Sequence, residues 1–344
     1  MENVQGIMKD PVYMEKAIIR LVPEKTKPLR KRNPWMAAGI LGLAVIGTCV
    51  VPAPGVRPIS ENERRTPIAA SATETPAPTR TATLAPSSTP TWTGTEVLEA
   101  TLTSLPDYKM DAKGVPMAYV PAGAFLMGSD RGSIDEYPIH PVDLEAFYID
   151  RYEVTNDLYR ACVEAEVCQP VRKKSSATRS SYYDSRRYKN FPVIFVDWHM
   201  AQTYCETWRG ARLPTEAEWE KAARGGTNVT YPWGDVPDCN LANYGNCLRD
   251  TSGVMIYDLG ASRYGPHHMA GNVWEWVSDW YSDAYYRSSP EDNPQGPDMG
   301  TEKVLRGGSW KDDYTEIRSV NREAENPSHS SHLIGFRCAK DANL

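Results

Sequence analysis

The stretch Met269-Ala-Gly-Asn-Val-Trp-Glu-Trp-Val-Ser-Asp-Trp280 contains three Trp, a Gly–Asn pair and one Glu, a mixture that packing alone rarely requires. Gly and Asn allow the backbone to turn sharply and to approach a ligand closely. In an extended segment, Trp274 and Trp276 share one face and Glu275 occupies the other. A carboxylate among large apolar rings is costly unless a cation or a donor meets it. The stretch is therefore either a Trp-rich core strand with a salt-bridged glutamate or part of a binding site.

Length and composition indicate one large domain with appendages. The chain has 344 residues, a net charge of −6 and 41% apolar residues, enough for a substantial core. The mild acidity does not indicate nucleic-acid binding. The chain has ten Trp and nineteen Tyr but only five Phe. Trp and Tyr combine an aromatic ring with a polar N–H or O–H group, and such side chains are common on surfaces that bind a partner.

The N-terminal segment predicts a single-pass membrane anchor. Residues 1–34 hold eight Lys or Arg and four acidic residues, and the seventeen residues 35–51 hold no charge. This length is at the short end of the roughly 17–25 residues that cross a bilayer as a helix. A basic flank before the span places the N-terminus in the cytoplasm. We expect an uncleaved signal anchor in the cell membrane with an extracytoplasmic C-terminal domain; a cleaved signal peptide and a lipoprotein acylated at Cys49 are the alternatives.

A segment of biased composition follows the predicted anchor. Residues 52–106 are rich in Thr, Pro, Ala and Ser. Such a segment cannot bury enough apolar surface to offset the entropy of ordering it. We interpret it as an extended stalk, a candidate for glycosylation, that holds the domain formed by residues 107–344 away from the membrane.

The cysteines fit an oxidising compartment. Of seven, Cys49 lies in the predicted membrane segment, which leaves an even number outside. Two pairs are close enough in sequence to close local loops, and the remaining two would then pair over a long span; six free thiols are the alternative. These pairs are Cys162 with Cys168, Cys239 with Cys247, and Cys205 with Cys338. Zinc is not indicated, because no Cys-x-x-Cys pair occurs.

Two helix signals stand out in the first half of the domain. Thr155 is a good cap for a helix that continues to about residue 165. Thr215 and Glu218 have capping-box spacing, and Gly225-Gly226 would end that helix. Apolar residues at spacings of three and four predict another helix over 197–209.

Strands and loops are expected elsewhere. We predict a short strand pair, 117–120 with 124–127, and a further strand over 142–149. Residues 169–190 are basic, rich in Ser and Tyr and without periodicity, so we interpret them as an exposed insertion. After residue 225 we expect little helix, with strands alternating with long turns.

Five motifs together resemble one known family. They are Tyr148-Ile-Asp-Arg-Tyr-Glu-Val-Thr-Asn156, Arg212-Leu-Pro-Thr-Glu-Ala-Glu-Trp-Glu220, Gly271-Asn-Val-Trp-Glu-Trp276, Arg306-Gly-Gly-Ser-Trp310 and Gly335-Phe-Arg-Cys338. In this order they resemble the formylglycine-generating enzymes, also called sulfatase-modifying factors. The resemblance implies an α+β, C-type-lectin-like fold with little regular secondary structure, and it supports the Cys205–Cys338 bond. Because function is carried by sites and not by folds, the reaction has to be argued separately.

The resemblance implies two calcium sites. The first would use Asn243, the carbonyl of Tyr244, Asp250 and the carbonyl of Ser252, although ordinary turn-making also explains the two side chains. The second would use the carbonyls of Gly271 and Val273 with the carboxylate of Glu275. Oxygen ligands of these kinds are what calcium prefers. At the second site His268 stands where relatives carry Asn or Asp, and imidazole is a poor calcium ligand.

The resemblance also implies an oxidase centre, which this chain departs from. In the family, two cysteines after the Gly-Gly-Ser motif bind copper and oxidise a substrate cysteine to formylglycine. The matching positions here hold Asp312 and Ile317, which cannot hold Cu(I) as thiolates do. Two residues of the oxygen pocket, Trp274 and Ser309, are retained. We therefore expect copper and formylglycine generation to be absent.

Iron is a further possibility within the resemblance, since some relatives are non-haem iron enzymes with a His triad. The six histidines are His140, His199, His267, His268, His329 and His332. The last four could converge in space, but they lie in loops where histidines are usually solvated. We therefore do not expect iron.

A binding groove is the remaining hypothesis for this site. Polar and aromatic side chains surround the former catalytic position: Trp310, Lys311, Asp312, Asp313, Tyr314, Arg318 and Arg322. Loops on a rigid scaffold commonly form recognition surfaces; the alternative is a solvated rim with the two arginines paired to nearby acids. Variable proteins of diversity-generating retroelements use this fold for ligand binding. We expect a membrane-anchored module that binds a peptide, protein or glycan; an oxidoreductase or a structural surface component is the alternative.

Overall fold

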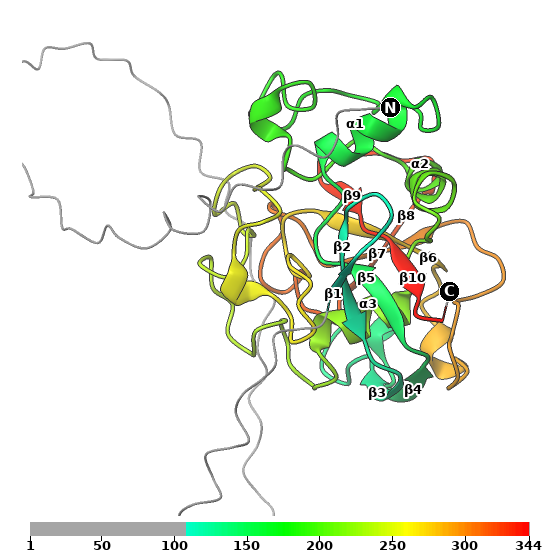
Figure 1. Ribbon diagram of the computed structural model, residues 1–344. Coiled ribbons are helices and arrows are strands. Elements are labelled where there is room, and N and C mark those ends of the chain that lie inside the picture. The colour runs from blue at the N-terminus through cyan, green and yellow to red at the C-terminus, as the bar shows by residue number, and fades with distance from the viewer. Residues whose placement is uncertain (1–107, 344) are drawn as a thin grey trace, which may run out of the picture. The chain divides into compact units, whose positions relative to one another are not determined.

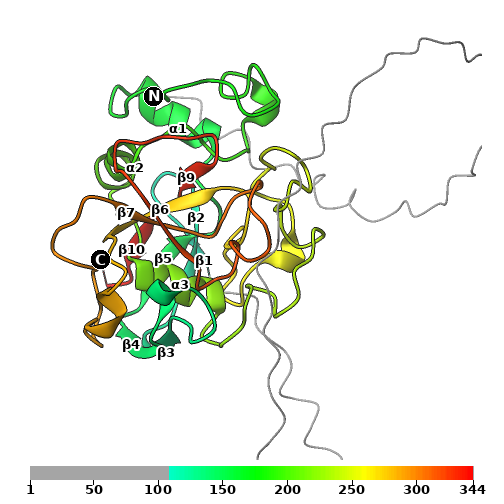
Figure 2. The ribbon, with the colours of Figure 1, turned by 180° about the vertical axis from the view of Figure 1, so that it is seen from behind.

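The computed structural model describes residues 108–343, which contain three β-sheets and three α-helices (Figures 1 and 2). The tail, anchor and stalk predicted for residues 1–106 lie outside the described residues. Within residues 108–343, no helix is both long and apolar enough to span a membrane. The arrangement agrees with the α+β, loop-rich fold that the motifs imply.

The first sheet joins the two ends of the described chain. Its antiparallel strands lie in the order β1–β2–β5–β10. Their bounds are Tyr108–Met110 for β1, Pro116–Val120 for β2, Phe147–Asp150 for β5 and Ala339–Asp341 for β10. Because β10 pairs with β5 beside β2, the last strand of the domain completes a sheet begun by the first.

The prediction that the strands at 117–120 and 124–127 pair with each other is wrong. β3 (Gly123–Met127) follows β2 directly but pairs with β4 (His140–Leu144) in a separate two-stranded sheet. The single strand predicted over 142–149 is likewise two strands, β4 and β5. The buried positions change parity between Leu144 and Phe147, so the two residues in between turn the chain from one sheet to the other.

The third sheet is built around the Trp-rich stretch. β6 (Trp274–Trp280) lies between antiparallel β7 (Lys303–Arg306) and parallel β9 (Ile334–Phe336), and β8 (Arg322–Glu325) pairs with β7. Trp274 and Trp276 pack into one core cluster with Phe336. Glu275 is fully buried on the other face, where its Oε2 accepts a 2.8 Å hydrogen bond from the indole of Trp219. The predicted alternation of Trp and Glu is confirmed.

The helices begin where their caps predict. α1 (Asn156–Glu164) is capped by Thr155, α2 (Trp198–Thr203) by Asp197, and α3 (Glu216–Arg224) by a complete Thr215–Glu218 capping box. α2 continues into a π-helical turn over Tyr204–Trp208. Gly225 ends α3 with a φ of 63°, in the left-handed region. Short 3₁₀ turns occupy Ile134–Glu136, Arg186–Tyr188, Asp258–Gly260 and Tyr285–Arg287.

The insertion at residues 169–190 is more buried than the sequence predicts. Tyr182 is 1% exposed, stacks on Tyr188, and donates a 2.6 Å hydrogen bond to the carbonyl of Pro192. Tyr183 and Val171 are buried as well. Stacking of aromatic side chains therefore docks this segment in place of regular secondary structure.

The three predicted disulfides are present. Cα–Cα distances are 5.3 Å for Cys162–Cys168, 5.6 Å for Cys205–Cys338 and 6.1 Å for Cys239–Cys247. The second bond joins the π-helical turn after α2 to the segment between β9 and β10. The bonds thus tie loops that have little regular secondary structure to hold them.

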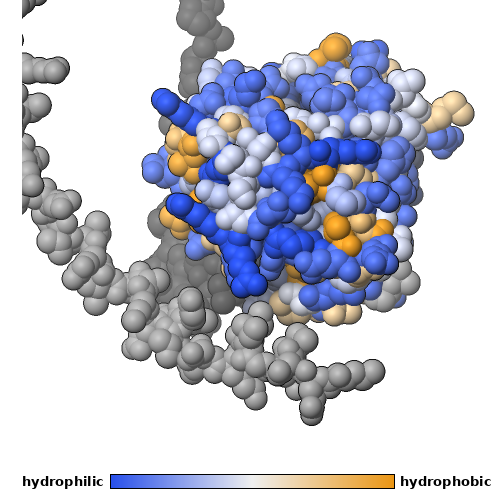
Figure 3. Space-filling model, turned by 90° about the horizontal axis from the view of Figure 1, so that it is seen from above, coloured by the Kyte–Doolittle hydropathy of each residue, from blue (hydrophilic) through white to orange (hydrophobic). Residues whose placement is uncertain are grey.

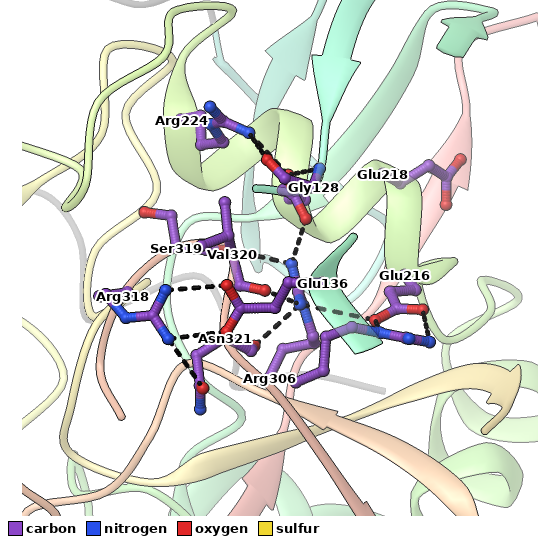
Figure 4. Close-up of polar contacts among 12 residues, drawn as sticks. Gly128, Glu136, Glu216, Glu218, Arg224, Arg306, Arg318, Ser319, Val320 and Asn321 are labelled. Carbon is purple, nitrogen blue, oxygen red and sulfur yellow. Dashed lines mark hydrogen bonds and ion pairs between the residues drawn. The ribbon is translucent and has the colours of Figure 1, made fainter. Parts of the chain in front are cut away.

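Buried ion pairs attach α3 to both neighbouring sheets (Figure 4). Arg306 of β7 is fully buried and donates to Glu220 at 2.6 Å and to the carbonyls of Ser319, Val320 and Asn321. The other oxygen of Glu220 accepts from the amide of Gly128 at 2.9 Å and from Arg224. One helix carboxylate therefore connects β7 to the end of β3.

Arg306→Met should destabilise the domain by roughly 3–5 kcal/mol, because it removes one of the two cations of the buried Glu220 carboxylate and leaves three backbone carbonyls without their arginine donor. The matched control is Lys174→Met in the exposed Lys174–Asp184 pair, where the side chains are 60% and 52% exposed. That change should cost at most about 1 kcal/mol. Denaturant unfolding of the two variants measures the difference, and equal midpoints would contradict the assignment.

The buried carboxyl group of Asp279 binds the N-terminus of α3. Oδ2 of Asp279 accepts hydrogen bonds from the amide of Glu216 at 2.8 Å and from the hydroxyl of Ser278 at 2.9 Å. Burial, with the nearby charge of Glu216, raises the pKa of Asp279 to about 7. Between about pH 4 and about pH 7 the Asp279 carboxyl is therefore protonated in the native state. In the unfolded chain, where its pKa has the ordinary value of 3.8, it has already released the proton.

Stability should fall as pH rises from about 4 to about 7, by roughly a kcal/mol per pH unit, because deprotonation favours the unfolded state in this window. Asp279→Asn keeps an oxygen acceptor and cannot ionise, so its midpoint should stay flatter across the window and exceed that of the unmodified chain at pH 7. Exposed Asp283→Asn is the control, and parallel pH profiles for all three chains would rule the mechanism out.

Candidate functional site

Asp312, which the family resemblance matches to the first copper-binding cysteine, has a carboxylate held by three hydrogen bonds. Oδ2 of Asp312 accepts hydrogen bonds from the indole of Trp274 at 2.8 Å, from the amide of Ser309 at 2.9 Å and from its hydroxyl at 2.5 Å. The turn that presents Ser309 requires glycine at Gly308, where φ is 73° and a Cβ would lie 2.7 Å from Ile317. The retained pocket residues therefore hold the Asp312 side chain.

The second cysteine-equivalent position is part of the core. Ile317 is fully buried and packs with Tyr231 and Ala270. All six cysteines between residues 108 and 343 are in disulfides. The residues present at this site therefore do not fit a thiolate-bound copper ion, because neither the carboxylate of Asp312 nor the sec-butyl side chain of Ile317 supplies soft sulfur.

A cluster of aromatic and basic side chains lies beside Asp312. We define the aromatic-basic cluster as Lys173, Phe195, Trp310, Lys311 and His332. The His332 ring centroid lies 5.8 Å from that of Trp310 and 6.1 Å from that of Phe195. The Nζ of Lys173 is 5.5 Å from the Phe195 ring. Burial, reinforced by Lys311, lowers the pKa of His332.

Backbone hydrogen bonds assemble this cluster from distant segments. The amide of Phe195 donates to Ser331 at 2.9 Å, and the amide of Arg172 donates to Phe195 at 3.0 Å. Phe195 has a φ of 58°, a left-handed conformation that is uncommon for a bulky residue. Sequence reasoning missed Lys173 and Phe195, because only the tertiary fold brings them to Trp310. The basic composition of the insertion was the one available signal.

The other predicted groove residues divide into two groups. Asp313 and Tyr314 are exposed in the same loop as Asp312. Arg318 instead pairs with Glu136 at 2.7 Å, and Arg322 is buried against Glu216 at 2.7 Å. Arg322 therefore does not line a groove, because its guanidinium is enclosed by carboxylate and carbonyl partners.

The first calcium ligand set is brought together, but its carboxylate is engaged. The Nδ2 of Asn243 donates to the carbonyl of Asp250 at 2.9 Å, and its Oδ1 is buried without a partner. Oδ2 of Asp250 accepts from the hydroxyls of Ser176 and Thr178, both at 2.6 Å. Its Oδ1 lies 3.3 Å from the guanidinium of Arg179, which also donates to Thr251. The two carbonyls of the set have acceptor roles as well: Tyr244 accepts from Cys247 and Ser252 from Asn272.

In the second calcium ligand set, the carboxylate of Glu275 is also paired with an arginine. Both oxygens of Glu275 accept from Arg337 at 2.6 Å. His268 is buried with neither ring nitrogen hydrogen-bonded, and burial lowers its pKa to about 3, so the ring is neutral. The backbone positions Gly271 and Val273 lie between His268 and Glu275 in the same buried stretch. Calcium would have to displace Arg179 at the first site and Arg337 at the second, and it stays a prediction of the resemblance.

The histidines do not gather into a metal centre in the described part of the chain. Between residues 108 and 343, no group of three or more His, Cys, Asp or Glu side chains is close enough to hold a metal ion. His140 packs at a tilt against Tyr286, His267 at a tilt against Tyr152, and His199 edge-to-face against Trp198, while His329 lies 3.9 Å from Glu325. In this part of the chain, only the sequence neighbours His267 and His268 interact with each other, and the others have partners that are not histidines.

Arg179→Met should cost roughly 3–5 kcal/mol of stability, because it leaves the buried Asp250 carboxylate without a cation. Lys174→Met, which removes a lysine from an exposed pair whose side chains are 60% and 52% exposed, is the control and should cost at most about 1 kcal/mol. Thermal melts in calcium buffer and in chelator provide the measurement. If calcium and not Arg179 neutralises Asp250, the Arg179 variant will melt normally in calcium and the unmodified chain will lose stability in chelator.

Comparison with known proteins identifies the family. Residues 105–342 match the domain described as Sulfatase-modifying factor enzyme 1-like. The formylglycine-generating enzyme of Streptomyces coelicolor is 36% identical, over 65% of this chain and 89% of that enzyme. The serine/threonine-protein kinase pkn1 of Chlamydia caviae is 38% identical over 65% of this chain, and the match spans about 38% of the kinase's own length.

Solved structures give the same result for the fold. PvdO from Pseudomonas aeruginosa superposes with a TM-score of 0.59 at 29% identity, over 69% of this chain and 99% of PvdO. Treponema denticola variable protein 1 has a TM-score of 0.59 at 26% identity, over 69% of this chain and all of that protein. The five motifs, the sheet built on β6 and these similarities agree, and the chain belongs to the sulfatase-modifying factor family, which includes the formylglycine-generating enzymes.

Proposed function

We propose that the domain is a ligand-binding member of its family without cysteine-oxidase activity. The observation that carries this proposal is the carboxylate of Asp312, hydrogen-bonded to Trp274 and Ser309 where the family holds a copper-binding thiolate. Hard carboxylate oxygen and the apolar Ile317 are poor substitutes for two soft sulfur ligands. A mouse relative named Inactive C-alpha-formylglycine-generating enzyme 2, 32% identical over 67% of this chain, supports the idea that the fold can be used without this activity.

The loop that carries Asp312 has the rigidity that a recognition surface needs. The amide of Gly245 donates to the carbonyl of Asp312 at 2.7 Å, and that of Asn246 donates to Trp310 at 2.9 Å. The hydroxyl of Tyr231 donates to the carbonyl of Tyr314 at 2.9 Å. Side chains on this loop are therefore presented in a fixed arrangement, which lowers the entropic cost of binding.

The position of the domain in the cell is part of the same proposal. Residues 35–51 would anchor the chain in the membrane and residues 52–106 would extend it outward. The three disulfides support an oxidising compartment, since such bonds are rare where thiols are kept reduced. The ligand would be a peptide, protein or glycan met outside the cytoplasm.

The oxidase assay tests the absence of activity directly. The full chain, supplied with copper and a Cys-x-Pro-x-Arg peptide, should form no aldehyde and show no thiol-dependent oxygen consumption, because no thiolate pair binds the metal. The Streptomyces coelicolor enzyme in the same assay is the positive control. Aldehyde formation above the copper-only background would refute the proposal.

Measuring the metal content of the protein distinguishes the proposed binding function from the alternative, an oxidoreductase that acts through a different centre. Elemental analysis of the purified chain should find less than one tenth of an equivalent of copper or iron, on the order of adventitious binding. Stoichiometric copper or iron that survives dialysis would favour the oxidoreductase.

A further inference from the structure

We infer that the free edge of β3 is a second binding site, which takes the C-terminal end of an extended peptide as an additional strand. No residue of the Asp312 loop lines this site, so the inference goes beyond the proposed function. It is carried by backbone groups of β3 that have no partner within residues 108–343 and by two cavities that lie along them.

The sheet formed by β3 and β4 has one closed edge and one free edge. It lies at the end of the domain opposite to α1 (Figures 1 and 2), whereas the α1 end presents a mostly hydrophilic face (Figure 3). The edge of β4 is closed, because the amide of Asp143 donates to the carbonyl of Glu291 at 2.7 Å and its carbonyl accepts from Asn293 at 2.9 Å.

The register of the sheet shows which groups of β3 face the free edge. Ala124 lies directly opposite Asp143. Opposed residues of an antiparallel pair form either two hydrogen bonds with each other or none. Since Asp143 bonds outward, Ala124 also directs its N–H and C=O away from β4. The same holds for Leu126, which lies opposite Pro141, a residue without an N–H.

Helix α3 satisfies only part of this edge. Arg224 donates to the carbonyls of Leu126 at 3.0 Å and Gly128 at 3.2 Å, and the amide of Gly128 donates to Glu220 at 2.9 Å. The N–H and C=O of Ala124 and the N–H of Leu126 have no hydrogen-bond partner among residues 108–343. Unpaired groups in a row on a sheet edge are a template for a further strand.

Two adjoining cavities leave room for that strand. The first, of about 330 Å³, is enclosed by residues 121–124, by Lys221 and the glycine pair after α3, and by Arg263 and Tyr264. The second, of about 320 Å³, is enclosed by residues 124–126, Pro141 and residues 226–228. Residues 124 and 226 line both cavities. Each volume is at the lower end of the roughly 300–1,000 Å³ of small-ligand sites, so it suits one or two peptide residues and not a folded domain.

The first cavity has a positive lining. Lys221 is 3% exposed, and its Nζ donates to the carbonyls of Pro121 at 2.9 Å and Gly123 at 2.6 Å, which leaves one of its three N–H groups. Arg263 is exposed, and neither cation forms an ion pair within residues 108–343. The exposed Asp143 acts on Lys221 from outside, and no acidic side chain lines either cavity. A carboxylate is the complementary group.

These features select the direction and the kind of ligand. Burial lowers the pKa of Lys221, so a carboxylate beside it also offsets the cost of that buried ammonium group. With its terminal carboxylate in the first cavity, a peptide would run antiparallel to β3 and place the preceding residues beside Ala124 and Leu126. The second cavity, with Phe125, Leu126 and Pro141 in its wall, would take an apolar side chain. Main-chain hydrogen bonds with pockets for alternate side chains are the usual form of strand addition.

A second copy of the chain fits this edge less well than a peptide. Pairing of two β3 edges about a two-fold axis places the same patch of both copies face to face. Lys221 and Arg263 of one copy would then meet their counterparts, and these like charges oppose the pairing. A peptide brings the missing charge and needs no such contact.

The test uses the full chain and fluorescence anisotropy, with an eight-residue peptide of alternating Thr and Val that carries a label at its N-terminus and a free C-terminal carboxylate. Methylation of every second amide nitrogen should weaken binding at least tenfold when the methyl groups face β3, and much less in the opposite phase, because only one set of amides pairs. An amidated peptide with Glu at its N-terminal position has the same charge and should bind about fivefold more weakly, because its carboxylate is misplaced.

Variants of the chain test the same contacts. Leu126→Pro removes an edge N–H that β4 does not use, and it should weaken binding about tenfold, whereas Leu126→Val keeps this N–H and should stay within about twofold. Arg263→Gln should weaken binding about fivefold. The matched control is Arg186→Gln, at an exposed arginine that lines neither cavity, and it should have no effect. Melting midpoints confirm that each variant is folded.

Absence of peptide binding to the full chain at millimolar concentration overturns the inference, as does an equal effect of the two methylation phases. Equal losses in Leu126→Val and Leu126→Pro, or in Arg186→Gln and Arg263→Gln, also overturn it. Self-association of the full chain that Leu126→Pro abolishes overturns it in favour of a second copy. Aldehyde formation in the oxidase assay would refute the proposed function and leave this site unaffected, so the two failures are distinguishable.

Discussion

The fold depends on placing one carboxylate, Glu275, in the centre of the domain without leaving its charge unpaired. The alternation of β6 sends Trp274 and Trp276 into one core and forces Glu275 into the other. The guanidinium of Arg337 and the indole of Trp219 meet it there. A buried charge of this kind is tolerated only with nearly complete hydrogen bonding, so β6, α3 and the segment after β9 have to be mutually placed.

The same principle is repeated around α3. Arg306, Arg322 and Arg224 each meet a carboxylate of the helix. Arg306 also donates to the carbonyls of residues 319–321, which lie outside the strands (Figure 4). In a domain with short strands and long loops, these arginines do what longer sheets do elsewhere: they satisfy buried backbone groups. The disulfides add covalent ties at loops that the arginines do not reach.

At the candidate site, side chains that the resemblance assigns to catalysis support the structure of a loop. Asp312 satisfies the donors of Trp274 and Ser309 internally, so the old pocket becomes a support for its loop. Beside it, the indole Nε1 of Trp310 is buried without a hydrogen-bond partner among the described residues. Asp313 and Tyr314 are exposed on the same loop, and exposed side chains on a loop held by hydrogen bonds are commonly used for recognition.

The sequence by itself determined the local elements and the family. Caps at Thr155 and Thr215, the alternation around Glu275 and the spacing of the cysteines all depend on neighbours a few residues away or on pairing by elimination, so they can be derived without coordinates. Tertiary structure decided the rest: that β3 leaves β2 for β4, that Arg322 is buried, and that Arg179 reaches Asp250. The aromatic-basic cluster, assembled from Lys173, Phe195, Trp310, Lys311 and His332, belongs to this second group. Periodicity encodes which face of a segment is buried, but the partner of a long charged side chain depends on distances between segments that only the packed fold fixes.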